Sequence, residues 1–443
     1  MRTIFVFAIL IPGVVAALTN RFAALLLYLW FALFRPQEWM WFDVTSWRLS
    51  LMLGILLVLP AIATGVLPNL THPLSLGGLL FLVCALLGQV HAFNSAVGWA
   101  WLDFFARLLI VTLLAVTLIN TPRRYFLTLL VVAGSFGFHA AKAGLAVVLG
   151  LGTVRFGEGA AGAFADNNGY AVGMAMIAPL LMCCGQTFER RALRIGFYAA
   201  GVLCVFGVIG TFSRGGFLAM TAGAIVFAML QRRRVLAVLL LVLLAVPVGY
   251  FVQISEGFSD RLQTINTFDE VNDASAIGRL HFWNVAIKMA KDYPLGVGLF
   301  NYESAYDAYD DSGGEFGSRR SVHSSHFQVL AETGFPGTAV WVAMFTWALW
   351  VAFRIRRKAM RTETLNPGDR RLFVSASTGL IASMVAFLVG GAFVAMALND
   401  LTWISFALVA ALDRLFQQAT AASAPAATET LRVPVFEAAQ RIG

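Results

Sequence analysis

The sequence contains little charge, few histidines and little cysteine. Charged residues make up 13% of its 443 residues, and there are six histidines and four cysteines. A soluble domain usually has about 25% charged residues. Apolar residues reach 59%, and the mean hydropathy is +0.76. This excludes a soluble globular protein, and also a disordered chain, which would be poor in large apolar residues. A polytopic membrane protein can use the whole length as one bundle.

The four cysteines form no disulfide framework and no zinc-binding spacing. Cys84, Cys183, Cys184 and Cys204 all lie inside apolar runs. We therefore predict that they are small buried residues within helices.

Apolar runs of membrane-spanning length recur along the chain. A helix that crosses a bilayer needs about 20 mostly apolar residues. We predict an all-α polytopic membrane protein with about 12 transmembrane helices, or 13 if both short runs at the start cross. The first run, Ile4 to Leu18, has no clear small-residue cleavage site and is interpreted as a membrane segment. The runs lie near 3–18, 22–34, 49–67, 74–92, 102–119, 125–150, 168–185, 195–212, 216–230, 235–252, 326–353, 372–394 and 397–416.

The basic residues of the short loops predict the orientation. Even numbers of runs separate the four main basic clusters, so all four can face the cytoplasm. With 12 spans both chain ends lie inside; with 13 the N-terminus lies outside. The net charge of +8 then reflects the orientation of the loops and does not indicate nucleic-acid binding. The clusters are Arg123–Arg124, Arg190–Arg194, Arg232–Arg234 and Arg354–Arg371.

The chain divides into a transmembrane bundle (1–252), one large outer loop (253–325), C-terminal transmembrane helices (326–416) and a loose tail (417–443). In the loop, eleven acidic residues stand against six basic ones. Apolar residues from Ile277 to Ala290 recur at helical spacing. They predict an amphipathic helix that ends at Tyr293-Pro294 and roofs a cavity for a lipid-linked or sugar ligand.

The segment Thr211-Phe212-Ser213-Arg214-Gly215-Gly216 begins a span on the outer side. Ser213 is a suitable helix cap. The free N–H groups of a helix start, together with Arg214, favour an anion such as phosphate. The alternative is an interfacial arginine beside an ordinary cap.

Further cations are candidates for the same site. Arg279 opens the loop helix and can bring a second guanidinium over the cavity. Lys142 and Arg155 can extend the cationic site on the outer side. Asp166 and Asn167 either join it or only cap the next span.

Two histidines mark the start of the span near 326. Ser325 to Gln328 fits a capping box, so His323 would precede the helix and His326 would lie in its first turn. A positive helix end disfavours imidazolium, so His323 would be neutral at pH 7 and able to act as a general base. The alternative is two interfacial polar residues. No third ligand has metal spacing, so we predict no metal, and Asp307, Asp310 and Asp311 as a solvated loop.

These residues leave two classes of function. One is an enzyme that acts on a lipid-linked phosphate, and the other is a transporter of an anionic substrate. Transporters often contain inverted repeats and broken helices at the membrane midplane. This sequence has no convincing internal repeat, and its key charges lie near one face, which favours the enzyme.

In order and topology, residues 120–350 resemble the O-antigen ligase/polymerase superfamily. The resemblance rests on Ser-Arg-Gly-Gly at 213–216, on Gly-Arg at 278–279 followed by Asp-Tyr-Pro-Leu-Gly-Val-Gly at 292–298, and on His-Ser-x-x-Phe-Gln-x-Leu-x-Glu-x-Gly at 323–334. The segment with Lys142 and Asp166-Asn167-Asn168 is also similar to O-glycosylation ligases associated with exosortase systems.

The resemblance implies a bacterial inner-membrane protein of GT-C-like glycosyltransferase architecture, with its active site facing the periplasm. Such ligases transfer a glycan from undecaprenyl diphosphate to the lipid A–core with inversion, and use no metal or nucleotide. It implies His323 as the base and Arg214 and Arg279 as diphosphate ligands, and less directly Lys142 and Arg155. Relatives often have an aromatic residue where this chain has His326, so either histidine can be the base. The implied partners are these two lipids and the bilayer, with no cofactor and no nucleic acid.

The resemblance also leaves other reactions open. An O-antigen polymerase uses the same chemistry with a growing glycan as acceptor. A protein O-oligosaccharyltransferase uses Ser or Thr. A lipid-linked glycan transporter is the alternative that is not an enzyme.

Overall fold

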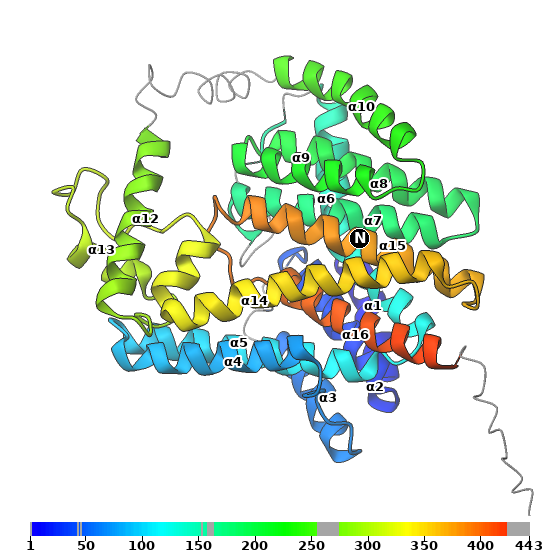
Figure 1. Cartoon of the computed structure of the whole chain (residues 1–443), viewed down its shortest axis with the longest axis horizontal. Coiled ribbons are helices and arrows are strands. Elements are labelled where there is room, and N and C mark those ends of the chain that lie inside the picture. The colour runs from blue at the N-terminus through cyan, green and yellow to red at the C-terminus, as the bar shows by residue number, and fades with distance from the viewer. Residues whose placement is uncertain are drawn as a thin grey trace, which may run out of the picture.

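The computed structural model describes residues 2–41, 44, 47–151, 154–156, 164–254 and 274–422. Over these residues it contains fifteen α-helices, most of which run side by side (Figure 1). The predicted all-α architecture is confirmed. The helices are α1 (Arg2–Thr19), α2 (Arg21–Phe34), α3 (Leu49–Ala63), α4 (Pro73–Gly88), α5 (Ser95–Leu118), α6 (Pro122–Leu149), α7 (Asn167–Thr187), α8 (Arg191–Gly210), α9 (Arg214–Met229), α10 (Arg234–Ile254), α12 (Ala274–Asp292), α13 (Tyr302–Tyr309), α14 (Ser325–Arg361), α15 (Pro367–Gly390) and α16 (Asp400–Ala422).

Helix α7 lies at the centre of the bundle, packed against α6, α8, α9 and α15. Nearly all of its residues from Gly169 to Gly185 are buried. Small residues let the neighbouring helices approach closely. A Cβ at Gly144 in α6, for example, would stand 1.8 Å from the carbonyl oxygen of Leu203 in α8. Close backbone approach of this kind is typical of helix packing within membranes.

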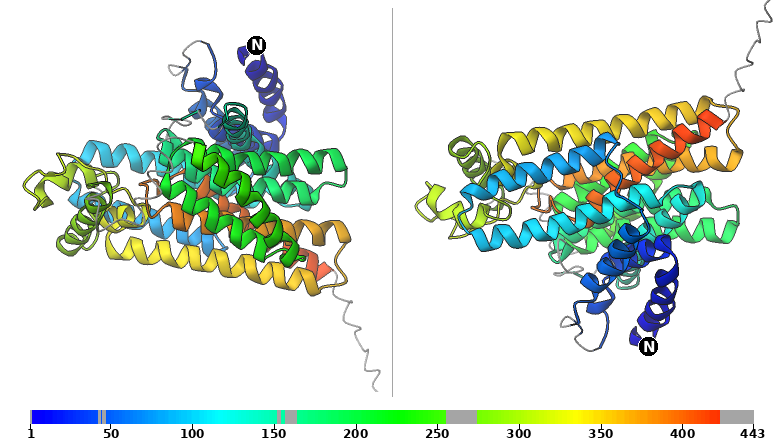
Figure 2. Two further views of the ribbon diagram at one scale, coloured as in Figure 1. Left: turned by 90° about the horizontal axis from the view of Figure 1, so that it is seen from above. Right: turned by 90° about the horizontal axis from the view of Figure 1, so that it is seen from below.

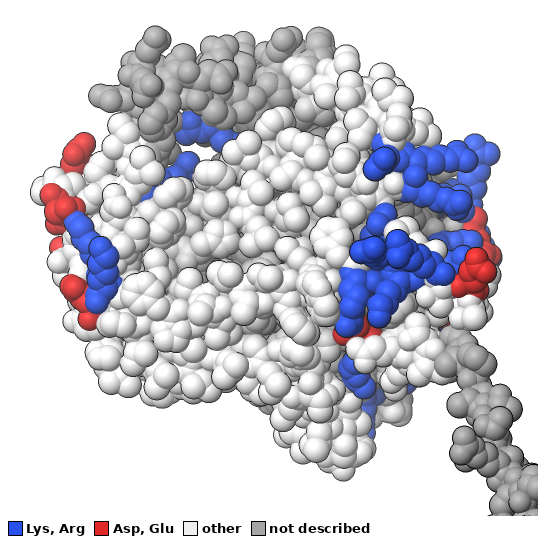
Figure 3. All heavy atoms as spheres, viewed as in Figure 1, with Lys and Arg blue, Asp and Glu red and all other residues white. Residues whose placement is uncertain are grey.

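Eight described helices are long and apolar enough to cross a membrane, and four shorter apolar helices accompany them. The face shown in Figure 3 has a broad middle band without charged side chains, as a bilayer-embedded surface requires. The protein is therefore a multi-pass membrane protein. Helix α1 runs across the axis of the main bundle (Figure 2). The number of crossings stays a prediction.

The predicted basic clusters lie at one end of the bundle, which we call the basic end. The turns between α7 and α8, between α9 and α10 and between α14 and α15 all lie there (Figure 1). Lysines and arginines gather at the same end in Figure 3. The even spacing predicted from the loops thus agrees with the fold. The four cysteines are buried and unpaired, as predicted.

The opposite end, which we call the cavity end, carries the described part of the outer loop. Helix α12 ends at Asp292, directly before Tyr293-Pro294, as predicted. The Tyr302 hydroxyl of α13 donates to the Phe282 carbonyl oxygen of α12 at 2.8 Å, and both side chains are buried. The two helices therefore share a small core of their own.

Two predicted boundaries shift. Helix α10 continues to Ile254, and α16 continues to Ala422, beyond the predicted start of the tail at residue 417. An apolar run marks only the part of a helix that lies in the membrane. The helix itself extends as far as its backbone hydrogen bonds continue. The rest of the predicted tail, 423–443, and loop residues 255–273 lie outside the described residues.

Candidate active site

The start of helix α9 is built as the sequence predicts. The Ser213 hydroxyl accepts a hydrogen bond from the Gly216 backbone N–H at 3.1 Å, and α9 begins at Arg214. A Cβ at Gly216 would stand 2.2 Å from the Ala171 Cβ, so only glycine allows α9 to pack this closely on α7. The positive end of the α9 dipole therefore lies at Arg214.

The start of helix α7 lies beside that of α9. The Asp166 carboxylate caps α7 by accepting from the backbone N–H groups of Asn168 and Gly169 at 2.8 and 3.0 Å. The Ser213 hydroxyl donates to Asn168 Oδ1 at 2.7 Å, and the Asn167 amide donates to the Thr211 carbonyl oxygen at 2.9 Å. Two positive helix ends therefore meet at one place, which favours an anion.

Two motifs of the family resemblance pair with each other at the base of the outer loop. The Phe335 N–H donates to the Pro294 carbonyl oxygen at 3.0 Å, and the Val297 N–H donates to the Ala331 carbonyl oxygen at 2.9 Å. Gly334 has φ 64° and ψ −166°, and a Cβ there would stand 2.0 Å from the Pro294 oxygen. These contacts fix α12 relative to the start of α14.

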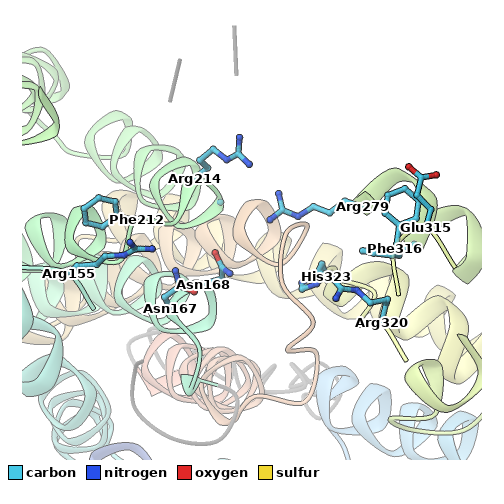
Figure 4. Close-up of a pocket in the computed structure, with 12 residues that line it drawn as sticks. Arg155, Asn167, Asn168, Phe212, Arg214, Arg279, Glu315, Phe316, Arg320 and His323 are labelled. Atoms are coloured by element: carbon cyan, nitrogen blue, oxygen red, sulfur yellow. The ribbon is translucent and has the colours of Figure 1, made fainter. Parts of the chain in front are cut away.

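A cavity of about 640 Å³ lies between these elements. Figure 4 shows Arg214 from α9 and Arg279 from α12 extending toward one another, with His323 below and between them. The cavity thus brings together five of the predicted site residues, Arg155, Asn167, Arg214, Arg279 and His323. Its lining consists of Arg155, Asn167, Asn168, Phe212, Arg214, Gly215, Arg279, Phe282, Glu315, Phe316, Arg320 and His323.

His323 has the properties of a general base. It precedes α14 and holds a left-handed backbone conformation, φ 47°, which is uncommon outside glycine. Burial, together with the positive charges of Arg279 and Arg320, lowers the pKa of His323, against a weaker opposite effect of Asp166. The imidazole is therefore neutral at pH 7. Among the described residues, no hydrogen-bond partner of its side chain is found, so a ring nitrogen can accept a proton from a ligand.

His326 is engaged in packing. Its Nε2 lies 2.9 Å from the Leu388 carbonyl oxygen, and its Nδ1 accepts from the Trp341 indole N–H at 3.4 Å. An indole N–H only donates and a carbonyl oxygen only accepts. The proton therefore sits on Nε2, and both nitrogens are occupied. His326 does not line the cavity, which favours His323 as the base.

The cap of α14 is Ser324, and the prediction of Ser325 is wrong. The Ser324 hydroxyl accepts from the Phe327 N–H, whereas Ser325 donates to the Val394 carbonyl oxygen and accepts from the Met396 N–H. Gln328 accepts from the Ala397 N–H instead of closing a capping box. The turns between α15 and α16 offer buried N–H groups at Met396 and Ala397, and these side chains satisfy them.

Arg320 is a cavity residue that the sequence analysis missed. Its guanidinium lies over the Phe282 ring, 5.7 Å from the ring centroid, and Arg155 lies over the Phe212 ring at 5.0 Å. In the sequence, the position of Arg320 three residues before His323 could have indicated that it lines the cavity. With Arg214 and Arg279, the described part of the chain contributes four guanidinium groups to the cavity, against one carboxylate from Glu315.

Lys142 is not among the residues that line the cavity. It is exposed on α6, near His139, whose Nε2 lies 2.9 Å from the Phe34 carbonyl oxygen. This side of α6 faces α2 rather than α9. Ser213 and Asp166 also lie outside the lining and act as caps.

One group of possible metal ligands occurs among the described residues, formed by His281, Asp310 and Asp311. Its ligand atoms already have partners. Asp310 accepts from His281, Ser312 and the Gly314 N–H, and Asp311 pairs with the Lys288 ammonium at 2.5 Å. Asp310, predicted to be part of a solvated loop, is instead a hydrogen-bonded hub, and these bonds lower its pKa to about 2.

In a comparison with known protein families, residues 199–342 match the family model of the O-antigen ligase. The match includes Arg214, Arg279 and His323 and ends within α14. No curated protein matches the chain.

Proposed function

We propose, from the match of residues 199–342 to the O-antigen ligase family model, that the chain has a ligase- or polymerase-type role in O-antigen processing and is an inverting, metal-independent glycosyltransferase. It transfers O-antigen glycan from undecaprenyl diphosphate to the lipid A–core oligosaccharide. The cavity end then faces the periplasm and the basic end faces the cytoplasm of a bacterial inner membrane, in agreement with the positive-inside rule.

One observation carries the proposal. A neutral histidine without a hydrogen-bond partner among the described residues shares a cavity with four arginines, where two helix N-termini meet. The histidine can accept the proton of a sugar hydroxyl. The arginines and helix ends can hold a diphosphate. Transfer of a sugar from a lipid diphosphate needs both a base for the hydroxyl proton and positive charge for the leaving group.

The reaction is a single displacement. The acceptor hydroxyl attacks C1 of the donor sugar, its proton passes to His323, and the bond between C1 and the diphosphate oxygen breaks. Negative charge grows on the leaving diphosphate, where Arg155, Arg214 and Arg279 stabilise it. Attack from the face opposite the leaving group inverts the anomeric centre. These three guanidinium groups supply the positive charge that a metal ion supplies in other phosphate sites.

Purified protein tests the proposal with two defined substrates, the undecaprenyl-diphosphate-linked glycan and lipopolysaccharide that lacks O-antigen. We expect a new glycosidic product from the native protein and a loss of about 10²–10⁴-fold in kcat for His323→Ala. His326→Ala is the matched control, since it removes an imidazole one turn away, and folded protein of this variant keeps most of its kcat.

Other outcomes contradict the proposal. Wild-type rates from His323→Ala would remove the base assignment. Movement of the lipid-linked glycan across vesicles without product would identify a transporter. In a deletion strain, single repeat units on the lipid A–core would indicate a polymerase, and loss of glycoprotein would indicate a protein oligosaccharyltransferase.

A further inference from the structure

The cavity has two chemically different walls. Arginines 155 and 214 and the starts of α7 and α9 form one wall, while Glu315 and Phe316 lie on the other side of His323, next to Arg320 (Figure 4). Glu315 is the only acidic residue among the described residues that line the cavity. A carboxylate repels a diphosphate, so the donor phosphates are expected at the arginine wall and not at this one.

The segment that carries Glu315 is held in a defined shape. The Asp310 carboxylate accepts from the Ser312 hydroxyl at 2.6 Å, the Gly314 N–H at 3.1 Å and His281 Nε2 at 2.8 Å. His281 belongs to α12, so Asp310 ties the turn to that helix. The segment is therefore preorganised rather than ordered by its ligand, and this reduces the entropy lost on binding.

Phe316 is anchored next to Glu315. Its ring stacks on the His281 imidazole, with 5.0 Å between ring centroids and an interplanar angle of 26°, and meets the Phe282 ring edge-on at 5.8 Å. The side chain is only partly buried. Because its neighbours fix the ring, it presents apolar surface at the cavity wall.

Glu315 itself has no ion-pair partner within the part of the chain that the structure describes, although arginines line the same cavity. An exposed carboxylate accepts hydrogen bonds from two hydroxyl groups at once. Charge-assisted hydrogen bonds of this kind are the stronger class. A carboxylate beside a fixed aromatic ring suits a pyranose, which has hydroxyl groups at its rim and an apolar C–H face.

We propose that Glu315 and Phe316 form the acceptor subsite, where they bind a hydroxyl-rich sugar and hold its nucleophilic hydroxyl against His323. This inference rests on the proposed glycosyltransferase function. The donor diphosphate and the acceptor sugar then approach His323 from opposite walls, as a displacement at C1 requires.

Steady-state kinetics with the two defined substrates test the subsite. For Glu315→Gln and for Phe316→Leu we expect the KM for O-antigen-free lipopolysaccharide to rise about five- to tenfold, while the KM for the lipid-linked donor stays within about twofold. Phe316→Tyr keeps the aromatic ring, so we expect its KM for O-antigen-free lipopolysaccharide to stay close to the native value. Glu303→Gln is the matched control, because it removes the same charge from the same loop outside the cavity, and it leaves both KM values unchanged.

Results that contradict the acceptor subsite can be distinguished from results that contradict the proposed function. An unchanged acceptor KM in both variants, or an equal rise of the two KM values, overturns the subsite. Complete loss of turnover in folded Glu315→Gln also overturns it, since that result would make Glu315 a group of the chemical step. If the native protein forms no glycosidic product, the proposed function fails instead. Melting temperatures separate misfolding of a variant from loss of binding.

Discussion

Arginines at the basic end and at the cavity end of the bundle differ in the partners of their guanidinium groups. At the basic end, Arg354 pairs with Asp413, a carboxylate buried on α16. Arg356 donates to the Thr378 hydroxyl at 3.1 Å and to the Leu230 carbonyl oxygen. Arg414 donates to the carbonyl oxygen of another helix, α5. These guanidinium groups are satisfied by the protein itself.

At the cavity end, Arg155 and Arg320 lie over aromatic rings, and among the residues with a described position neither has a carboxylate or carbonyl partner. Arg354 also lies over a ring, that of Trp350, but it has the Asp413 carboxylate as well. A ring face holds a cation without occupying its N–H donors. The same residue type therefore stabilises the fold at one end and remains able to bind an anion at the other. The predictions below test this difference.

The largest effect is expected from removing a cavity arginine. Arg155→Ala should lower kcat/KM by about 10²–10³-fold, because it removes donors that in the proposed reaction stabilise charge on the leaving diphosphate. The melting temperature should change little. Steady-state kinetics and thermal unfolding in detergent measure the two quantities. Full activity, or a loss explained by unfolding alone, would contradict the contrast between the two ends.

The reverse pattern is expected at the basic end. Arg354→Ala removes the guanidinium from the buried Asp413 carboxylate, which keeps Gln417 and His72 as partners, so we expect a loss of about 1–3 kcal/mol in free energy of unfolding. The folded fraction should keep its kcat/KM. Arg357→Ala is the control, as an exposed arginine of the same helix and end, and should change neither quantity. A selective loss of activity in Arg354→Ala would show that the two ends are not separate.

Much of the fold was predictable because its signals are local. Apolar runs gave helices near the predicted bounds, the Ser213 cap was identified before Arg214, and the Tyr293-Pro294 pair ended α12. Helical periodicity, caps and proline each act within a few residues along the chain. Such signals do not depend on the rest of the structure.

Which residues line the cavity was less predictable, because this depends on how the helices are rotated and packed. Lys142 lies on the side of α6 that faces α2, so it does not line the cavity although its sequence context favoured this. His323 and His326 are three residues apart, and only the contacts of His326 with Leu388 and Trp341 distinguish them. Arg320 enters the cavity because the loop folds back over α12.

A glycine tests how the cavity end is held together. Gly334→Ala places a Cβ against the Pro294 oxygen and forces a backbone conformation available essentially to glycine, which alone costs about 1–3 kcal/mol. We expect reduced stability and lower activity of the remaining folded protein. Gly134→Ala in α6 is the control, where a Cβ meets nothing within 4 Å. It should be neutral or stabilising by up to about 1 kcal/mol. Equal effects at both positions would contradict a special role of the loop base.

The pH dependence gives a smaller effect. Burial and the two nearby guanidinium groups lower the pKa of His323, so kcat/KM should fall only when the pH drops below this lowered pKa and the imidazole becomes protonated. Arg320→Gln removes one positive charge, which makes imidazolium less unfavourable. The acid limb of the kcat/KM profile should therefore move to higher pH. Arg319→Gln, an exposed neighbour outside the cavity lining, is the control. An equal shift in both variants would assign the effect to general charge rather than to the cavity.

Chelation should have no effect on transfer. In the proposed reaction, Arg155, Arg214, Arg279 and the two helix N-termini supply positive charge where the leaving group develops its negative charge. The one described cluster with metal-ligand geometry, around Asp310, has its oxygen atoms engaged with His281, Ser312 and Gly314. Exhaustive dialysis against a chelator should therefore leave kcat and both KM values as they were. Loss of activity that returns when Mg²⁺ or Zn²⁺ is added would contradict this. If His281→Gln abolished that recovery, the metal would lie at the Asp310 cluster, and the arginines of the cavity end would no longer account for leaving-group stabilisation by themselves.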